Sequence, residues 1–164
     1  MFIKKKKLML TVILALSFLL LMGGIISAKE LTVIATSDIH GAIYPWSYKI
    51  GESDDIGLAK IASMVKEAKK ENPNLLLVDA GDTIQGNTLT AQFRDRRDVE
   101  HPLMKVMNHM GYSAMVLGNH EFNFGLETMG EILADADFPI LGANTIVRES
   151  GQPLYDPYTI KEID

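Results

Sequence analysis

Short apolar runs alternate with longer amphipathic stretches along most of this chain. The runs are rich in β-branched and aliphatic residues and predict strands; the stretches carry apolar residues at helix spacing. The strands are predicted at residues 31–35, 75–78, 114–117, 139–141 and 158–163. The helices are predicted at residues 58–70, 89–94, 102–110 and 126–136. This alternation predicts an α/β fold with a mostly parallel sheet. The run at 75–78 is apolar throughout, so we expect it to be buried on both faces.

The first 28 residues follow a different pattern. Lysines at 4–7 precede an apolar stretch over 8–22, and small residues lead up to Ala28. This order is typical of a secretory signal peptide cleaved after Ala28, which leaves 29–164 as the folded part. An uncleaved anchor is the open alternative, because the apolar segment approaches the roughly 20 residues that a membrane span needs. In both cases we expect an exported domain that meets a membrane only through this segment, outside the cell or in the cell envelope.

Charge and composition exclude several classes of function. Loss of residues 1–28 removes four of the 16 basic residues and none of the 21 acidic ones, so the net charge moves from −5 to −9. Such a surface is unsuited to binding nucleic-acid polymers, which requires basic stripes. The sequence contains no cysteine, so disulfides, thiolate metal sites and cysteine nucleophiles are excluded.

Polar side chains follow three of the predicted strands, at the point where each strand ends. Asp38 and His40 follow the first strand, Asp82 follows the second, and Asn119 and His120 follow the third. The carboxyl ends of parallel strands are where α/β sheets build their ligand sites. Carboxylate, amide and imidazole groups together suit divalent metals, and such metals suit phosphate chemistry. The combination therefore predicts a metal site at this edge of the sheet.

Each of these strings has a simpler explanation when taken alone. Asp-x-His and Gly-Asp occur in turns and helix caps, and Asn-His can also cap a helix. The string that begins at His120 resembles the zinc-protease pattern His-Glu-x-x-His, but Phe124 replaces the second histidine. The chain contains no phosphate-binding loop of the Gly-x-x-x-x-Gly-Lys type and no Gly-x-Ser-x-Gly elbow. Only the metal hypothesis explains all three strand ends together.

In order and spacing, these strings resemble the calcineurin-like metallophosphoesterase superfamily. More narrowly, they are similar to the exported group of 5′-nucleotidases and 2′,3′-cyclic-nucleotide 2′-phosphodiesterases. The resemblance covers essentially all of residues 29–164. The strings that carry it are Asp38-x-His40-Gly41, Gly81-Asp82-Thr83-Ile84-Gln85-Gly86-Asn87 and Gly118-Asn119-His120-Glu121-Phe122-Asn123.

The resemblance implies a role for each metal-ligating residue. Asp38 and His40 would bind a first divalent ion, Asp82 would bridge two ions, and Asn119 would bind the second ion and the substrate. The mixed nitrogen and oxygen ligands admit Mn, Zn, Fe or Co. The implied reaction is hydrolysis of a nucleotide or cyclic-nucleotide phosphoester.

Two further residues have catalytic roles by the same resemblance. His120 would contact the substrate and stabilise the transition state or protonate the leaving oxygen, and Asn123 would orient His120. Asn123 favours the 2′,3′-cyclic-nucleotide 2′-phosphodiesterase/3′-nucleotidase type, because 5′-nucleotidases of this group usually carry aspartate there. The pair Gly86-Asn87 favours the same type. A 5′-nucleotidase of the same family is the open alternative.

The resemblance also predicts that the site in this chain is incomplete. The family fold is a four-layer α/β/β/α sandwich, and residues 29–164 match its N-terminal half. The family supplies three further histidines later in the chain, whereas no histidine follows His120 here. The chain is therefore expected to be a truncated domain whose missing half could come from another chain. A catalytically incomplete fragment, or a metal- or nucleotide-binding module without turnover, is the alternative.

Overall fold

The computed structural model describes residues 4–7, 9–14 and 29–163 of the 164-residue chain. Residues 4–7 and 9–14 are helical, and no helix among the described residues is long and apolar enough to cross a membrane. The predicted cleavage after Ala28 and much of the apolar segment lie outside the described residues.

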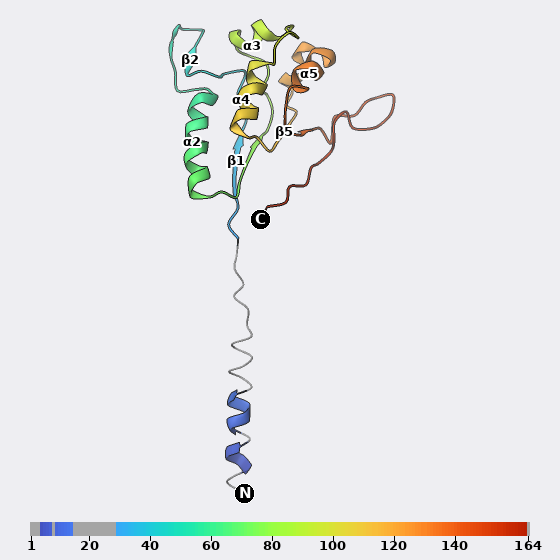
Figure 1. Cartoon of the computed structure of the whole chain (residues 1–164). Helices are drawn as coiled ribbons and strands as arrows, with labels where there is room; N and C mark the ends of the chain where they lie inside the picture. Colours follow the sequence, from blue (N-terminus) through green and yellow to red (C-terminus); the bar gives the residue numbers. More distant parts are fainter. Residues whose placement is uncertain (1–3, 8, 15–28, 164) are drawn as a thin grey trace.

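The remaining elements alternate as the apolar pattern predicts (Figure 1). The strands are β1 (Thr32–Thr36), β2 (Trp46–Ser47), β3 (Glu52–Ser53), β4 (Leu75–Asp79), β5 (Ala114–Val116) and β6 (Ile140–Leu141). The helices are α2 (Leu58–Glu71), α3 (Thr88–Phe93), α4 (Pro102–Met110), α5 (Leu126–Leu133) and a 3-10 turn, η1 (His120–Phe124).

The main sheet consists of four parallel strands in the order β1-β4-β5-β6. Strand β1 pairs with β4 so that Thr32 lies beside Leu75 and Thr36 beside Asp79. The carboxyl ends of β1, β4 and β5 therefore lie at the same edge of the sheet. This arrangement confirms the predicted parallel α/β fold and brings the loops after these three strands together.

Helices cover one face of this sheet and build the core there. The helices α2 and α4 lie side by side, and α2 also contacts β4 (Figure 1). On the sheet, Leu77 and Met115 are completely buried, and α4 contributes Leu103 and Met107 to the same cluster. The proline at the start of α4 and the left-handed Gly111 at its end match the predicted boundaries.

The opposite face of the sheet is open within the described residues. Val33 on β1 is 56% exposed and Val116 on β5 is 42% exposed. The prediction that β4 is buried on both faces is therefore wrong: Leu77 is buried, whereas Leu76 and Val78 are only half-buried. The cause is that helices pack on only one face of the sheet in this part of the chain.

Other details of the predicted elements also differ from the structure. The fifth strand predicted at 158–163 does not form; instead the chain makes one parallel bridge between Leu141 and Asp156. Pro157 follows immediately and has no N–H to extend the ladder. A small hairpin of β2 and β3, between β1 and α2, is absent from the predicted elements. Helix α5 also ends at Leu133 rather than at Ala136.

His101 is a buried residue at the N-cap position, directly before α4. Its side chain is 2% exposed, and neither ring nitrogen has a hydrogen-bond partner among the described residues. Its backbone N–H donates to Asp135 Oδ2 at 2.6 Å. Burial lowers the pKa of His101 from 6.5 to about 4.

This buried imidazole predicts a loss of stability in mild acid. Between pH 6.5 and pH 4 the unfolded chain protonates His101 while the folded chain does not, so acid favours unfolding. We expect His101 to remove about 3 kcal/mol of stability as the pH falls through this window. Urea unfolding at pH 7 and pH 4.5 measures the loss. His101→Leu should abolish most of it, whereas His109→Gln, at an exposed position, should not.

Candidate active site

The loops after β1 and β4 are joined by backbone hydrogen bonds that continue the strand pairing beyond the sheet. The N–H of Asp38 donates to the carbonyl of Gly81 at 3.0 Å, and that of His40 donates to the carbonyl of Asp82 at 3.0 Å. The predicted ligands Asp38, His40 and Asp82 therefore lie on adjacent loops at the carboxyl edge of the sheet. This is where the sequence analysis placed them.

His40 is oriented as a metal ligand should be. Its Nδ1 lies 3.0 Å from the carbonyl oxygen of Gln85, and because a carbonyl only accepts, Nδ1 carries the proton. In the ring form that binds metals, the lone pair is therefore on Nε2, which lies 3.8 Å from Asp38 Oδ1. Histidines that bind metals commonly donate their other N–H to a carbonyl in this way. The unprotonated nitrogen of His40 thus lies beside the Asp38 carboxylate.

The three loop residues share an unusual backbone conformation. Asp38, His40 and Asp82 have φ values of 54°, 48° and 58°, and within the described residues no other non-glycine residue has a positive φ. Left-handed backbone costs a non-glycine residue of order 1–2 kcal/mol. Strain concentrated at the three strongest ligand candidates favours a functional explanation over ordinary turns.

The loop after β5 brings Asn119 and His120 to the same edge. The backbone N–H of His120 donates to Asp82 Oδ1 at 2.8 Å. The rings of His40 and His120 lie edge to face, with centroids 5.0 Å apart. Asn119 is exposed and directly precedes η1. All three strand ends therefore contribute to one cluster.

Asn123 contacts His120 one turn along η1, as the predicted orienting role requires. Its amide Nδ2 lies 2.8 Å from His120 Nδ1 and 3.3 Å from Gln85 Oε1. Because Nδ2 can only donate, His120 Nδ1 accepts and the ring proton is on Nε2. His120 is then a neutral hydrogen-bond donor at the nitrogen that faces away from Asn123.

The donor set fits a divalent metal in its chemistry, but these residues do not complete a site. In the part of the chain that the structure describes, no three His, Cys, Asp or Glu side chains gather closely enough to hold an ion. Asp38 and His40 supply one oriented pair, and Asp82 lies on the adjoining loop. Their assignment as metal ligands, together with Asn119, stays a prediction.

Glu121 is a site residue that the sequence analysis missed. Its carboxylate is completely buried and accepts backbone N–H groups from the loops after β4 and β5. In the sequence, Glu121 belongs to a failed zinc-protease pattern and to the string Gly118–Asn123 that carries the family resemblance, and neither gives it a role of its own. The sequence gives only a weak signal of this burial, namely a charged residue directly after His120 in a string that otherwise resembles a turn.

Asp79, at the end of β4, forms a second buried carboxylate below the site. Its oxygens accept from the hydroxyls of Thr36 and Thr83, each at 2.6 Å, and from the N–H of Gly81 at 2.9 Å. Burial raises the pKa of Asp79, although these hydrogen bonds oppose the shift. Tyr112 extends the network, with its hydroxyl 2.9 Å from Thr36 Oγ1, and burial raises the pKa of Tyr112 to about 12.

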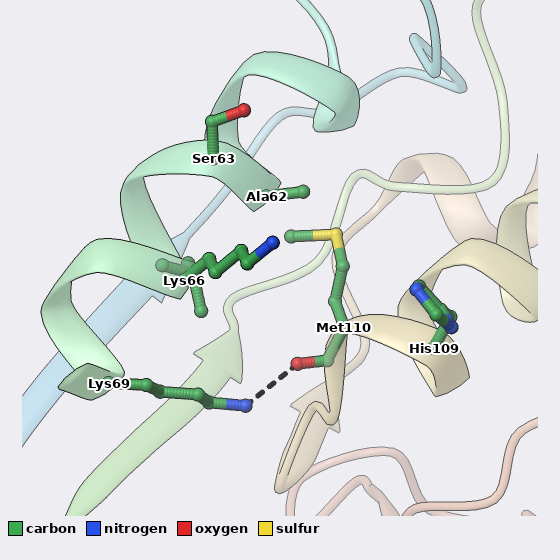
Figure 2. Close-up of a pocket in the computed structure, with 7 residues that line it drawn as sticks. Ala62, Ser63, Lys66, Lys69, His109 and Met110 are labelled. Carbon is green, nitrogen blue, oxygen red and sulfur yellow. Dashed lines mark hydrogen bonds between the residues drawn. The ribbon is translucent and has the colours of Figure 1, made fainter. Parts of the chain in front are cut away.

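Two adjoining grooves lie at this cluster of site residues. A groove beside Asp38 and His40 reaches Gly86 and Asn87, and a neighbouring groove lined by Trp46 adjoins it at the same two residues. A separate pocket lies between α2 and α4 (Figure 2). Its lining residues are Ala62, Ser63, Val65, Lys66, Lys69, His109 and Met110.

The pocket between α2 and α4 has a structural explanation. Lys69 Nζ donates to the carbonyl of Met110 at 2.9 Å, so the lysine caps the C-terminal end of α4 (Figure 2). The pocket contains no carboxylate and lies on the helical layer, away from the strand ends. We therefore place the candidate active site at the carboxyl edge of the sheet.

Known proteins share this arrangement. The chain is 42% identical over 141 residues to the trifunctional nucleotide phosphoesterase protein YfkN of Bacillus subtilis, covering 81% of this chain and 10% of that protein. It is 39% identical to a 2′,3′-cyclic-nucleotide 2′-phosphodiesterase/3′-nucleotidase of Salmonella typhimurium, covering 81% and 21%. It is 35% identical to a rat 5′-nucleotidase, covering 92% and 27%. The chain thus spans about a quarter or less of the length of these relatives.

Solved structures agree with the sequence comparison. The crystal structure of calcineurin-like phosphoesterase YfkN from Bacillus subtilis superposes with a TM-score of 0.75 at 41% identity, covering 80% of this chain and 42% of that one. A 5′-nucleotidase precursor from Thermus thermophilus gives a TM-score of 0.62 at 30% identity, covering 81% and 26%. Residues 31–161 match the sequence profile of the calcineurin-like phosphoesterases, an enzymatic family that uses divalent metal ions. The chain belongs to the calcineurin-like phosphoesterase family.

Proposed function

We propose that this chain is part of an exported, metal-dependent enzyme that hydrolyses the phosphoesters of nucleotides. The observation that carries the proposal is the orientation of His40, whose proton on Nδ1 directs the Nε2 lone pair toward Asp38. The relatives of similar sequence are named for nucleotide phosphoester hydrolysis, which supports the substrate class.

In this proposal Asp38, His40, Asp82 and Asn119 would hold two divalent ions. Such ions polarise the phosphoryl group and activate water for attack on phosphorus. Asp82 fits the bridging role, because Oδ1 accepts the N–H of His120 while Oδ2 has no hydrogen bond to another described residue. Its side chain is therefore fixed at one oxygen and open at the other.

His120 would protonate the departing ester oxygen or stabilise its charge. With its proton on Nε2, the ring can donate a hydrogen bond to an oxygen that gains negative charge. Asn123 keeps the ring in this tautomer and limits its rotation. The role of Asn123 is therefore to position His120 rather than to react.

For the finer substrate we propose a 2′,3′-cyclic nucleotide, with a 5′-nucleotide as the alternative. A neutral amide at Asn123 and the Gly86-Asn87 pair support the cyclic type, whereas the relatives include both types. Assays of the purified protein with Mn²⁺ should show hydrolysis of 2′,3′-cyclic AMP faster than hydrolysis of 5′-AMP. EDTA should abolish both activities. Metal-independent hydrolysis at the same rate would contradict the proposed chemistry.

A binding module without turnover is the second candidate, because the described residues hold no complete group of three ligands. It predicts saturable nucleotide binding without hydrolysis of 2′,3′-cyclic AMP or bis(p-nitrophenyl) phosphate. Trp46 is the only tryptophan in the sequence, and it lines the groove next to the candidate site. Its fluorescence therefore gives a direct readout of nucleotide binding, independent of turnover.

Export and assembly complete the proposal. The lysines at 4–7 and the apolar segment that follows support export, with the membrane contacted only by this segment. A mature N-terminus at Lys29 would support signal cleavage, and retention of residues 1–28 would support the anchor. The remaining metal ligands would come from the second half of the domain, supplied by a longer form of this chain or by a separate chain.

A further inference from the structure

Glu121 is a completely buried carboxylate whose partners are backbone amides. Burial of a charge is costly unless hydrogen bonds replace the lost water. Oε2 accepts the N–H of Asp82 at 2.8 Å and that of Gly118 at 2.7 Å. Oε1 accepts the N–H of Thr83 at 2.5 Å and that of Ile84 at 3.2 Å. Four charge-assisted hydrogen bonds therefore stabilise this single side chain.

These bonds join two different loops. Asp82, Thr83 and Ile84 belong to the loop after β4, whereas Gly118 belongs to the loop after β5. Bonds that share one rigid carboxylate keep the two loops at a constant separation. The N–H of His120 donates in return to Asp82 Oδ1, so the two acidic residues tie the loops together in both directions.

The backbone of Asp82 requires such support. Its φ of 58° is strained for a residue with a side chain, and strain of this kind persists only where the surroundings enforce it. Glu121 binds the N–H of Asp82 itself and those of the next two residues. The carboxylate therefore holds the strained segment from within the fold.

We propose that Glu121 is a positioning residue that sets the separation and orientation of Asp82 and Asn119 for divalent-metal binding. This inference rests on the proposed function, because it assigns Glu121 a role in the same metal site. Glu121 itself does not coordinate the ion, since all of its hydrogen-bonding capacity is directed at backbone amides. Without it, the loops that carry Asp82 and Asn119 would lose these four hydrogen bonds and keep the one between the His120 N–H and Asp82 Oδ1.

The test compares Glu121→Gln with Glu127→Gln in the purified protein. Glutamine places an NH₂ group against backbone N–H donors, so Glu121→Gln loses about half of the bonds and gains a repulsive contact. Glu127 lies in the exposed first turn of α5, and its substitution removes the same charge without burying a polar group. Isothermal titration with Mn²⁺ should show affinity about 10- to 100-fold weaker for Glu121→Gln and unchanged for Glu127→Gln.

A second readout needs no metal. The amide protons of Asp82, Thr83 and Gly118 should exchange at least about 10-fold faster in metal-free Glu121→Gln, as followed by NMR, while those of the β1–β4 pairing keep their protection. A purely structural role predicts lower thermal stability with the Mn²⁺ affinity of the folded protein unchanged. That result, or unchanged protection of the three amides, would overturn the proposal.

Glu121→Asp covers the case in which the glutamine variant does not fold. It keeps the charge but shortens the reach, so we expect Mn²⁺ affinity between that of the wild type and about a tenth of it. An affinity equal to that of the wild type would count against the proposal. If the wild type binds no Mn²⁺, the proposed metal site fails, and the amide-exchange comparison still decides whether Glu121 positions the two loops.

Discussion

With the second half of the domain present, Asp82→Asn should keep its fold and lose about 1,000-fold in kcat/KM for phosphoester hydrolysis. Asparagine has the same shape, tolerates the left-handed backbone at φ 58°, and can still accept the N–H of His120 through its amide oxygen. The change removes only the negative charge that would bridge two cations. Metal-assisted stabilisation of the transition state is worth several kcal/mol, and each 1.36 kcal/mol corresponds to about a tenfold change in rate.

The measurement is Mn²⁺-dependent hydrolysis of bis(p-nitrophenyl) phosphate, with Mn²⁺ affinity measured on the same preparation. Asp55→Asn is a matched control, because Asp55 is exposed and its ion pair among the described residues is with Lys60 on the surface. We expect the control to retain wild-type kinetics. If Asp82→Asn retained full turnover and full Mn²⁺ affinity, Asp82 could not be a bridging ligand.

Gly81→Ala should destabilise the protein by about 3 kcal/mol and separate the loops of the candidate site. Gly81 has φ 92°, a conformation that costs a residue with a side chain about 1–2 kcal/mol. A Cβ at this position would also overlap the backbone nitrogen of Gly118, and such overpacking typically costs about 1–3 kcal/mol. Because the overlapping atoms belong to the backbone, neither loop can relieve the clash by changing a side-chain rotamer.

Urea unfolding of the metal-free protein measures this loss. Gly130→Ala provides the opposite control, because Gly130 lies within α5 and a Cβ there meets no atom within 4 Å. Alanine at this helical position should stabilise the protein by about 0.5–1 kcal/mol. A Gly81→Ala variant as stable as the wild type would show that the two loops are not packed as described.

The elements that could be predicted from sequence are those whose own residues determine them. The run at 75–78 is indicated by its continuous apolar residues and the helix at 102–110 by its apolar periodicity, and α4 has proline at its start and glycine directly after its end. The fifth strand at 158–163 failed because apolar content alone does not supply a ladder partner, and Pro157 interrupts the one available. The half-buried state of Val78 also depends on what covers the sheet, which local sequence does not encode.

The residues of the candidate site also divide into those that could be predicted from the sequence and those that could not. Asp38, His40, Asp82 and Asn119 could be located because each directly follows a recognisable strand, and parallel strands bring their ends together. The role of Glu121 could not be found in this way. Glu121 matters because its carboxylate accepts hydrogen bonds from four backbone N–H groups, which belong to residues 3 to 39 positions away in the sequence. Composition and periodicity do not indicate such contacts. The side-chain contact between Asn123 and His120, three residues apart, was accessible because a single turn brings them together.

The left-handed backbone of Asp38, His40 and Asp82 also constrains how this protein can diverge. Asparagine, aspartate, histidine and glycine tolerate that conformation best, and three of these four are metal-binding residue types. Selection for folding and selection for metal chemistry therefore favour the same few residue types at these three positions. A lineage released from catalysis should accumulate asparagine or glycine there first, and a saturation library screened only for solubility should recover the same pair.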